Sequence, residues 1–160
     1  MFKTQLRAIL RASAYGCVKI MFPMIVSLAE IRQSRALLAE CMAELRQASV
    51  PFDEDIAVGI MVETPAAVIM ADQLAAQTDF FSIGTNDLTQ YVTATDRGNA
   101  RVQALYDPFN PAVLRAIYQT GQAATAHHIL AGVCGETASM DHMIPFLIGA
   151  GIRELSVSQG

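Results

Sequence analysis

Residues 56–65 read I-A-V-G-I-M-V-E-T-P, and this stretch decides the fold. The run Ile56–Val62 is apolar throughout, as in a central strand that is buried on both faces of a parallel sheet. Thr64 is a good N-cap and Pro65 suits the first turn of a helix, so a helix is predicted from there to about Ala76. A buried strand, one charged residue and a helix start together indicate a β/α unit.

The same alternation of short apolar runs and helical stretches continues along the chain. Further strands are predicted at Val18–Met24, Asp79–Ile83, Ile129–Val133 and Glu154–Ser158. Helices are predicted over 28–48 after the Ser27-x-x-Glu30 capping box, from Asn110-Pro111 to about His127, and after Asp141, with Pro145 in the first turn. Residues Gly84–Asp87 are predicted to form a loop. Residues 1–160 are therefore predicted to be a single α/β domain with a parallel sheet of about five strands.

The chain carries few charges for its size. Of its residues, 52% are hydrophobic and 16% are charged, against about 25% charged in an average domain. Three explanations stay open: burial within a larger assembly, an apolar surface that binds a partner, or a compact alanine-rich globule. The net charge of −4, with no basic run, makes nucleic acid and anionic membranes poor candidate partners.

Targeting and redox signals point to a cytoplasmic protein. No apolar run approaches the roughly 18 residues of a membrane span, so no membrane insertion is expected. The first eleven residues carry three basic side chains without an apolar segment, which argues against a signal peptide. Cys17, Cys41 and Cys134 are an odd number without C-x-x-C spacing, which favours reduced thiols over disulfides or a zinc site.

Polar residues cluster where the predicted strands end, and in α/β sheets and barrels the chemistry lies at the carboxyl ends of strands. This rule selects Glu63, Asn86, Asp87, Cys134 and Glu136. Neighbouring parallel strands are about 4.8 Å apart, so Glu63 and Asp87 can reach one point above the sheet. Two carboxylates with substrate oxygens and water are a usual way to hold Mg²⁺. Alternatively, Glu63 and Asp87 only cap the helices that follow them.

Three further side chains could take part in chemistry. Asn86 could donate its amide to a phosphoryl oxygen or form an Asx turn. Arg97 lies in a predicted loop and suits bidentate phosphate binding, although a loop arginine also commonly makes a surface ion pair. Cys134 is either an inert buried thiol or an acid, since a free thiol is largely protonated at neutral pH. His127 and His128 are predicted at a helix C-terminus, not as nucleophiles.

Taken in order, several runs make the chain resemble the C-terminal domain of the bacterial phosphoenolpyruvate–protein phosphotransferases, the enzyme I family. The matching runs are Gln5–Arg11, Ile20–Met24, Met61–Ala67, Phe80–Tyr91, Asp96–Asn99 and Cys134–Glu136. The run Phe80–Tyr91 is typical of the wider phosphoenolpyruvate-utilising group. The M-V-E-T-P-A-A and D-R-G-N forms point within that group to enzyme I, away from pyruvate phosphate dikinase and phosphoenolpyruvate synthase.

The resemblance implies a role for each candidate residue. Glu63 and Asp87 are expected to bind Mg²⁺, and Asn86, Asp87 and Arg97 to bind the substrate, phosphoenolpyruvate. Cys134 is expected to be the proton donor that turns the enolate into pyruvate. In the family, the phosphoryl group passes to a histidine of a separate N-terminal domain and then to the carrier protein HPr, and the C-terminal domain forms homodimers.

The resemblance also implies a partial (β/α)₈ TIM barrel of about five βα units that does not close, because a whole barrel usually needs about 250 residues. Met1 would lie in the helix before the fourth strand, and the phosphohistidine domain and further phosphate-binding arginines would lie outside the chain. Little activity is therefore expected from these residues alone. Two alternatives stay open: a non-catalytic fragment for dimer assembly, and a Mg²⁺-dependent carbon–carbon lyase acting on pyruvate enolate.

Overall fold

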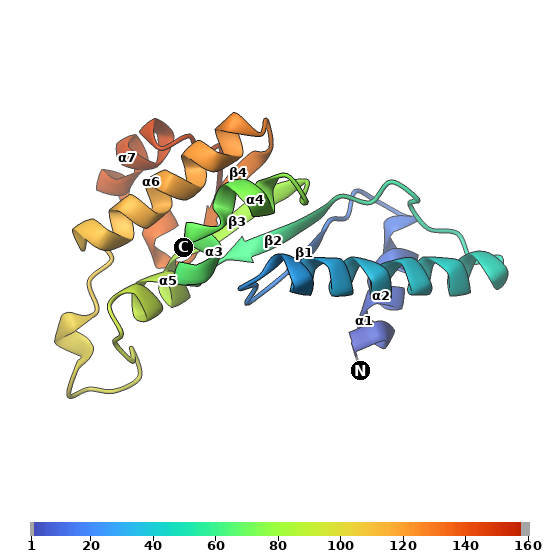
Figure 1. The fold of residues 1–160 in the computed structure, drawn as a ribbon, viewed down its shortest axis with the longest axis horizontal. Coiled ribbons are helices and arrows are strands. Elements are labelled where there is room, and N and C mark those ends of the chain that lie inside the picture. Colours follow the sequence, from blue (N-terminus) through green and yellow to red (C-terminus); the bar gives the residue numbers. More distant parts are fainter. Residues whose placement is uncertain (1, 158–160) are drawn as a thin grey trace.

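The computed structural model describes residues 2–157, which form one five-stranded sheet with helices packed against it (Figure 1). The strands are β1 (Ile20–Phe22), β2 (Val58–Val62), β3 (Phe80–Gly84), β4 (Leu130–Cys134) and β5 (Glu154–Ser156). They pair in chain order, β1-β2-β3-β4-β5, and every pair is parallel. The predicted α/β class and the five parallel strands are therefore confirmed. Ser158, the predicted end of the last strand, lies outside the described residues.

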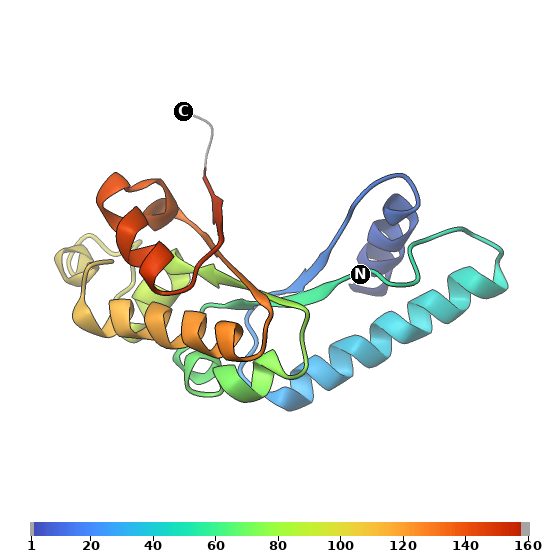
Figure 2. The same cartoon turned by 90° about the horizontal axis from the view of Figure 1, so that it is seen from above.

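The sheet is open. β1 and β5 each pair with one neighbour and lie at its two edges, well apart in Figure 2. The register places Val62 beside Ile83 and Gly84 beside Cys134, so the carboxyl ends of β2, β3 and β4 form one edge. This alignment brings the residues that follow three different strands to one place.

Helices follow the strands as the β/α alternation predicts. They are α1 (Phe2–Ser13), α2 (Leu28–Gln47), α3 (Pro65–Ile69), α4 (Ala71–Ala75), α5 (Thr85–Val92), α6 (Pro111–Ala126) and α7 (Ile144–Gly149), with short 3₁₀ turns at Gln103–Leu105, Glu136–Ser139 and Asp141–Met143. Figure 2 shows α2, α4 and α6 along one side of the sheet. None of the helices within residues 2–157 is long and apolar enough to cross a membrane.

Side-chain caps account for several of these helix starts. The Ser27 hydroxyl accepts from the Glu30 amide while the Glu30 carboxylate accepts from the Ser27 amide, so the predicted capping box is confirmed. The Thr64 hydroxyl accepts from the Ala67 amide at 3.1 Å and donates to the carbonyl of Ile25. Thr64 thereby caps α3 and also ties it to the loop after β1.

Three local predictions were wrong in detail. The helix predicted from Thr64 to about Ala76 is divided at Met70 into α3 and α4. In place of the predicted loop Gly84–Asp87, Gly84 ends β3 and Thr85–Asp87 form the first turn of α5, because polar and acidic side chains are also favourable beside the unpaired amides of a helix N-terminus. Asp141 lies in a 3₁₀ turn, and the helix after it starts at Ile144 with Pro145 in its first turn.

The core lies between the sheet and the helices on its outer face. Ile60, Phe81 and Ile83 from the strands are fully buried there. Side chains alternate along a strand, so Met61 and Ser82 lie on the opposite face, where they are only partly buried. At the carboxyl ends of the strands, this inner face borders the predicted site.

Candidate active site at the carboxyl edge of the sheet

Glu63, directly after β2, is a charged side chain placed almost entirely inside the protein. It is 2% exposed, and its Oε1 accepts a hydrogen bond from the Met24 amide at 2.7 Å. A Cβ atom on Gly84 would lie only 3.0 Å from Glu63 Oε2. The glycine at the end of β3 therefore leaves the space that the carboxylate of Glu63 occupies.

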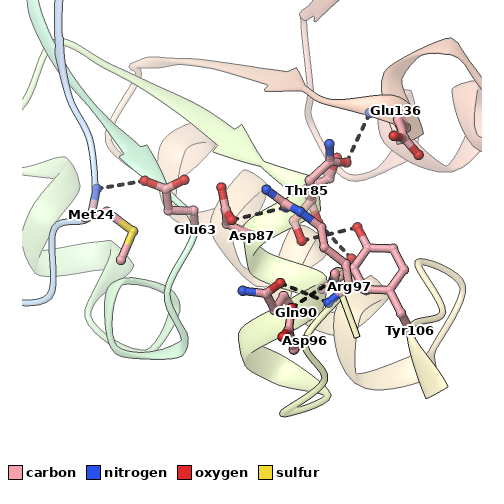
Figure 3. A network of polar contacts seen from close by, with 12 residues as sticks. Met24, Glu63, Thr85, Asp87, Gln90, Asp96, Arg97, Tyr106 and Glu136 are labelled. Atoms are coloured by element: carbon pink, nitrogen blue, oxygen red, sulfur yellow. Dashed lines mark hydrogen bonds and ion pairs between the residues drawn. The ribbon is translucent and has the colours of Figure 1, made fainter. Parts of the chain in front are cut away.

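Asp87 lies in the first turn of α5, and Figure 3 shows its carboxylate turned toward that of Glu63. On its other side, Asp87 Oδ1 pairs with Arg97 Nη1 at 3.1 Å. The structure thus brings together two carboxylates from the ends of consecutive strands, as the sequence predicts. Glu63 caps no helix, since Thr64 is the N-cap of α3.

The electrostatics of this pair favour the arrival of a cation. Burial raises the pKa of Glu63 above its usual range, and the hydrogen bond from the Met24 amide opposes that rise. The negative charge of Asp87 raises the pKa of Glu63 further, whereas Arg97 lowers it. Two adjacent carboxylates therefore face a single nearby guanidinium, and one of them is held in a poorly solvated position.

The donor set suits a metal that needs few protein ligands. Within residues 2–157 no group of three or more histidine, cysteine, aspartate or glutamate side chains could hold a metal ion. Mg²⁺ is commonly bound through one or two carboxylates, with substrate oxygens and water completing its shell. The oxygen ligands of Glu63 and Asp87 fit that pattern, whereas they would not suit zinc or another thiophilic metal.

Arg97 is held over the site by its own loop. Its amide donates to Oε1 of Gln90 at 3.1 Å, and the next amide, that of Gly98, donates to Oδ1 of Asp96 at 2.8 Å. The Arg97 side chain is 44% exposed. It does form an ion pair, as one alternative anticipated, but its partner is a carboxylate of the site, so the guanidinium stays at the carboxyl edge.

Asn86 is fixed through both of its oxygens. Its side-chain Oδ1 accepts from the Glu136 amide at 3.2 Å, and its backbone carbonyl accepts from the Tyr106 hydroxyl at 3.2 Å. Burial raises the pKa of Tyr106, so this phenol remains a donor. Since the amide oxygen of Asn86 is used, its NH₂ group is the part available to donate to a ligand.

Gly135 permits this close approach. Its φ of 102° lies in the left-handed region, and a Cβ there would stand 2.6 Å from Thr85 Oγ1 and 3.0 Å from Asn86 Oδ1. Thr85 in turn donates its hydroxyl to the carbonyl of Cys134 at 2.9 Å. The turn after β4 and the start of α5 are therefore joined across the site.

Cys134 ends β4 opposite Gly84 and is partly buried. Its Sγ is 3.5 Å from the carbonyl oxygen of Ile83 and 3.5 Å from Ser82 Oγ. With Asn86 and Glu136 it lines an open cavity of about 350 Å³. Cys134 and Asn86 therefore border the same space.

Comparison with known proteins decides the family. The family described as PEP-utilising enzyme, PEP-binding domain, matches residues 1–160. The chain belongs to this family. Proteins from Priestia megaterium and Bacillus subtilis, both named phosphoenolpyruvate-protein phosphotransferase, are 52% and 50% identical to it over 99% and 98% of its length. The chain spans about 28% of the length of each.

Solved structures agree on the fold of this PEP-binding domain. An HpcH/HpaI aldolase/citrate lyase family protein from Burkholderia cenocepacia has a TM-score of 0.67 at 19% identity, covering 97% of this chain and 62% of that one. A citrate lyase from Burkholderia xenovorans has a TM-score of 0.62 at 18% identity, covering 93% and 53%. These neighbours are TIM-barrel-like, so the predicted partial barrel is confirmed, and identity this low carries no more than the fold.

The histidines and the other cysteines described in the PEP-binding domain are not among the residues that line the cavity beside Cys134. His127 is the C-cap of α6, as predicted, and the ring of His142 stacks on Phe109 with centroids 4.9 Å apart. None of the three cysteines forms a disulfide in the described residues: Cys17 is exposed, Cys41 buried and Cys134 partly buried.

Several residues that shape the site were not predicted from the sequence. They are Met24, Ser82, Gln90, Tyr106 and Gly135. Met24 acts through its backbone amide, which no residue type encodes, and Tyr106 reaches Asn86 across 20 residues. Only Gly135 left a signal, because a glycine between two polar residues after a strand often marks a left-handed or crowded position.

Proposed function

We propose that these residues form the phosphoenolpyruvate-binding part of a phosphoenolpyruvate–protein phosphotransferase. In that reaction the phosphoryl group of phosphoenolpyruvate passes to an enzyme histidine and then to HPr, and pyruvate is released. The observation that carries the proposal is the convergence of Glu63, Asp87, Arg97, Asn86 and Cys134 at one sheet edge. About 50% identity to proteins named for this activity supports it.

We propose that Glu63 and Asp87 hold Mg²⁺. Their facing carboxylates, the burial of Glu63 and its raised pKa support a cation between them and the substrate. When bound, Mg²⁺ would neutralise charge on the phosphoryl and enolate oxygens as the phosphorus–oxygen bond breaks. Asp87 thus serves both the metal and the substrate, and its ion pair with Arg97 keeps the guanidinium nearby.

Arg97 and Asn86 would bind the phosphoryl oxygens. A guanidinium can form two parallel hydrogen bonds to phosphate, and the Asn86 NH₂ group is left available once its oxygen has accepted from the Glu136 amide. Donors fixed before the reaction stabilise the charge that develops in the transition state. The contacts of the Arg97 loop with Gln90, and those of Asn86 with Tyr106 and Glu136, supply this fixed arrangement.

Cys134 would protonate the methylene carbon of the enolate. Its S–H group donates to the carbonyl of Ile83 and lines the same cavity as Asn86, so an acid lies beside the proposed phosphoryl site. The acceptor histidine would belong to another domain of the whole protein, as in the family, and none of the described histidines lines the cavity that Asn86 and Cys134 share. HPr binding, homodimer formation and a cytoplasmic location are proposed for that whole protein.

The lyase alternative is not favoured. The solved aldolase and citrate lyase structures share only 18–19% identity with this chain. The proteins named phosphoenolpyruvate-protein phosphotransferase share about 50% identity over nearly all of it. The assembly-only alternative does not account for an amide, a guanidinium, two carboxylates and a thiol gathered at one edge.

Proton exchange tests the proposed function in the chain itself. Pyruvate in D₂O should exchange its methyl protons slowly in the presence of the chain, as followed by proton NMR. The exchange should require Mg²⁺ and should be lost in Cys134→Ala. With phosphoenolpyruvate, Mg²⁺ and HPr, no phosphorylated HPr is expected from these residues alone. Exchange that persists in Cys134→Ala or with EDTA would contradict the assignment.

A further inference from the structure

Ser82 contacts the one thiol of the site. It lies in the middle of β3, on the inner face of the sheet, and its Oγ donates to the Sγ of Cys134 at 3.5 Å. The thiol in turn donates to the carbonyl of Ile83 at 3.5 Å. The sulfur of Cys134 therefore has one hydrogen-bond donor and one acceptor, both from the neighbouring strand.

The strand register explains why Ser82 can reach this sulfur. Ser82 pairs with Gly132, and Cys134 is the next residue of β4 whose side chain lies on the same face. Because Gly132 has no side chain, no side chain at that position separates the Ser82 hydroxyl from Cys134. Within the described part of the chain, the sulfur is the hydrogen-bond partner recorded for this hydroxyl.

We propose that Ser82 is a positioning residue for Cys134: it fixes the thiol toward the cavity and stabilises the thiolate that proton donation leaves behind. The proposal rests on the proposed role of Cys134 as proton donor. Beyond that role of Cys134, the proposal gives Ser82 two tasks: to hold the sulfur in place and to stabilise its negative charge.

The balance of the step shows where the hydroxyl acts. The electron pair of the enolate forms a C–H bond with the thiol proton, the S–H bond breaks, and its electron pair stays on Sγ as a thiolate. The Ser82 O–H group then donates to an anion instead of a neutral sulfur, and hydrogen bonds to charged groups are roughly twice as strong. Water returns the proton to Cys134 before the next cycle.

Thiol alkylation tests the contact without depending on catalysis. Ser82→Thr keeps the hydroxyl and Ser82→Val removes it. Because threonine and valine have nearly the same shape, a difference between these two variants reports the hydroxyl alone. In a Cys17→Ser background, which removes the exposed thiol, iodoacetamide should modify Cys134 about three- to tenfold more slowly in Ser82→Val near neutral pH. Ser82→Thr should stay within about twofold of the parent, as should Ser34→Ala, which removes a hydroxyl from α2 that does not line this cavity.

Ser82→Ala guards against a packing effect of valine, and it should slow alkylation by the same factor. Circular dichroism confirms that each variant is folded. Equal alkylation rates in Ser82→Val, Ser82→Ala and the parent would overturn the proposal.

Pyruvate proton exchange separates this proposal from the proposed function. Exchange should fall in Ser82→Val, recover in Ser82→Thr and be absent in Cys134→Ala. If Cys134→Ala abolishes exchange but Ser82→Val changes neither exchange nor alkylation, the proposed function stands and the role of Ser82 is refuted. If Cys134→Ala leaves exchange intact, the proton-donor role fails, and the role of Ser82 in the reaction fails with it.

Discussion

Acidic side chains at the two edges of the sheet differ in how far their negative charge is neutralised. At the amino edge, Asp79 precedes β3, and its Oδ2 accepts from the Val58 amide at 2.7 Å and pairs with Arg35 at 3.5 Å. At the carboxyl edge, Glu63 and Asp87 face each other and share the positive charge of Arg97. The amino edge neutralises its charge internally, whereas the carboxyl edge keeps an excess of negative charge.

Acidic residues whose charge is neutralised within the protein stabilise the fold, whereas acidic residues without such neutralisation are candidates for binding a ligand. Ion pairs such as Lys3 and Arg7 with Glu44, and Arg46 with Glu54, are complete within the protein. The carboxylate of Glu63 is buried beside another carboxylate, an arrangement that costs stability unless a cation binds. A strand-end acid of this kind is therefore a better indicator of function than an acid with a complete set of partners.

The largest effect is expected from Asp87→Ala in a full-length phosphotransferase that carries this segment. The change removes a proposed metal ligand and the partner of Arg97, so phosphoenolpyruvate turnover should fall by about 10²–10³-fold or more. The fold should persist, because Asp87 lies at the start of α5 and is partly exposed. Steady-state pyruvate release measures the effect, and turnover within about threefold of the parent would contradict the role of Asp87.

Gly135→Ala should weaken both the fold and the site. The new Cβ would occupy a left-handed backbone position and press against Thr85 and Asn86, at a cost of about 1–3 kcal/mol. Urea unfolding measures the loss. The matched control is Gly16→Ala, because no atom beyond its two chain neighbours lies within 4 Å of a Cβ at Gly16. Equal losses in the two variants would mean that the turn after β4 is not crowded.

Asp79→Ala should reduce stability without affecting the site. It leaves the Val58 amide and Arg35 without this partner at the amino edge, which should cost about 1–2 kcal/mol of unfolding free energy. Mg²⁺-dependent phosphoenolpyruvate binding should be unchanged, in contrast to Asp87→Ala. Loss of ligand binding in a folded Asp79→Ala protein would remove the distinction between the two edges.

The smallest effect is a difference in pH dependence between two glutamates. The pKa of Glu63 is raised, so the folded state binds more protons, and its destabilising effect at neutral pH fades as pH falls toward 4.5. The pKa of Glu44 is lowered, chiefly by Arg7 and then by Lys3, so its stabilising effect is present above 4.5 and is lost as pH falls through its folded value.

Melting temperatures of the metal-free chain measure these opposite signs. At pH 7, Glu63→Gln should raise the melting temperature by about 2–4 °C, and Glu44→Gln should lower it by less. Near pH 4 both differences should shrink. A Glu63→Gln protein that melts below the parent at pH 7 would show that the carboxylate is not strained in the absence of a cation.

The sequence predicts the elements of this fold better than it predicts their contacts. Each strand signal became a strand, because a run such as Ile56–Val62 can only be buried. The break at Met70 and the helical start at Thr85 were missed, since both depend on packing that local pattern does not record. The partial barrel came from the family resemblance rather than from periodicity.

For the candidate site too, the sequence predicts the residues better than their contacts. Strand-end position was enough to select Glu63, Asn86, Asp87 and Cys134, because the parallel register aligns these ends. The alignment could not predict that Arg97 pairs with Asp87, that the Glu136 amide fixes Asn86, or that Ser82 reaches the thiol. These contacts depend on loop paths and backbone atoms, which residue identity alone does not specify.

Calorimetric titration of phosphoenolpyruvate into the chain, with Mg²⁺ and with EDTA, tests the cation site at the carboxyl edge most directly. The parent and Asp79→Asn should bind phosphoenolpyruvate weakly when Mg²⁺ is present and not measurably in EDTA. The double variant Glu63→Gln/Asp87→Asn should lose the response to Mg²⁺ while staying folded. Binding of equal strength in Mg²⁺ and in EDTA, or an unchanged Mg²⁺ response in the double variant, would contradict the cation site.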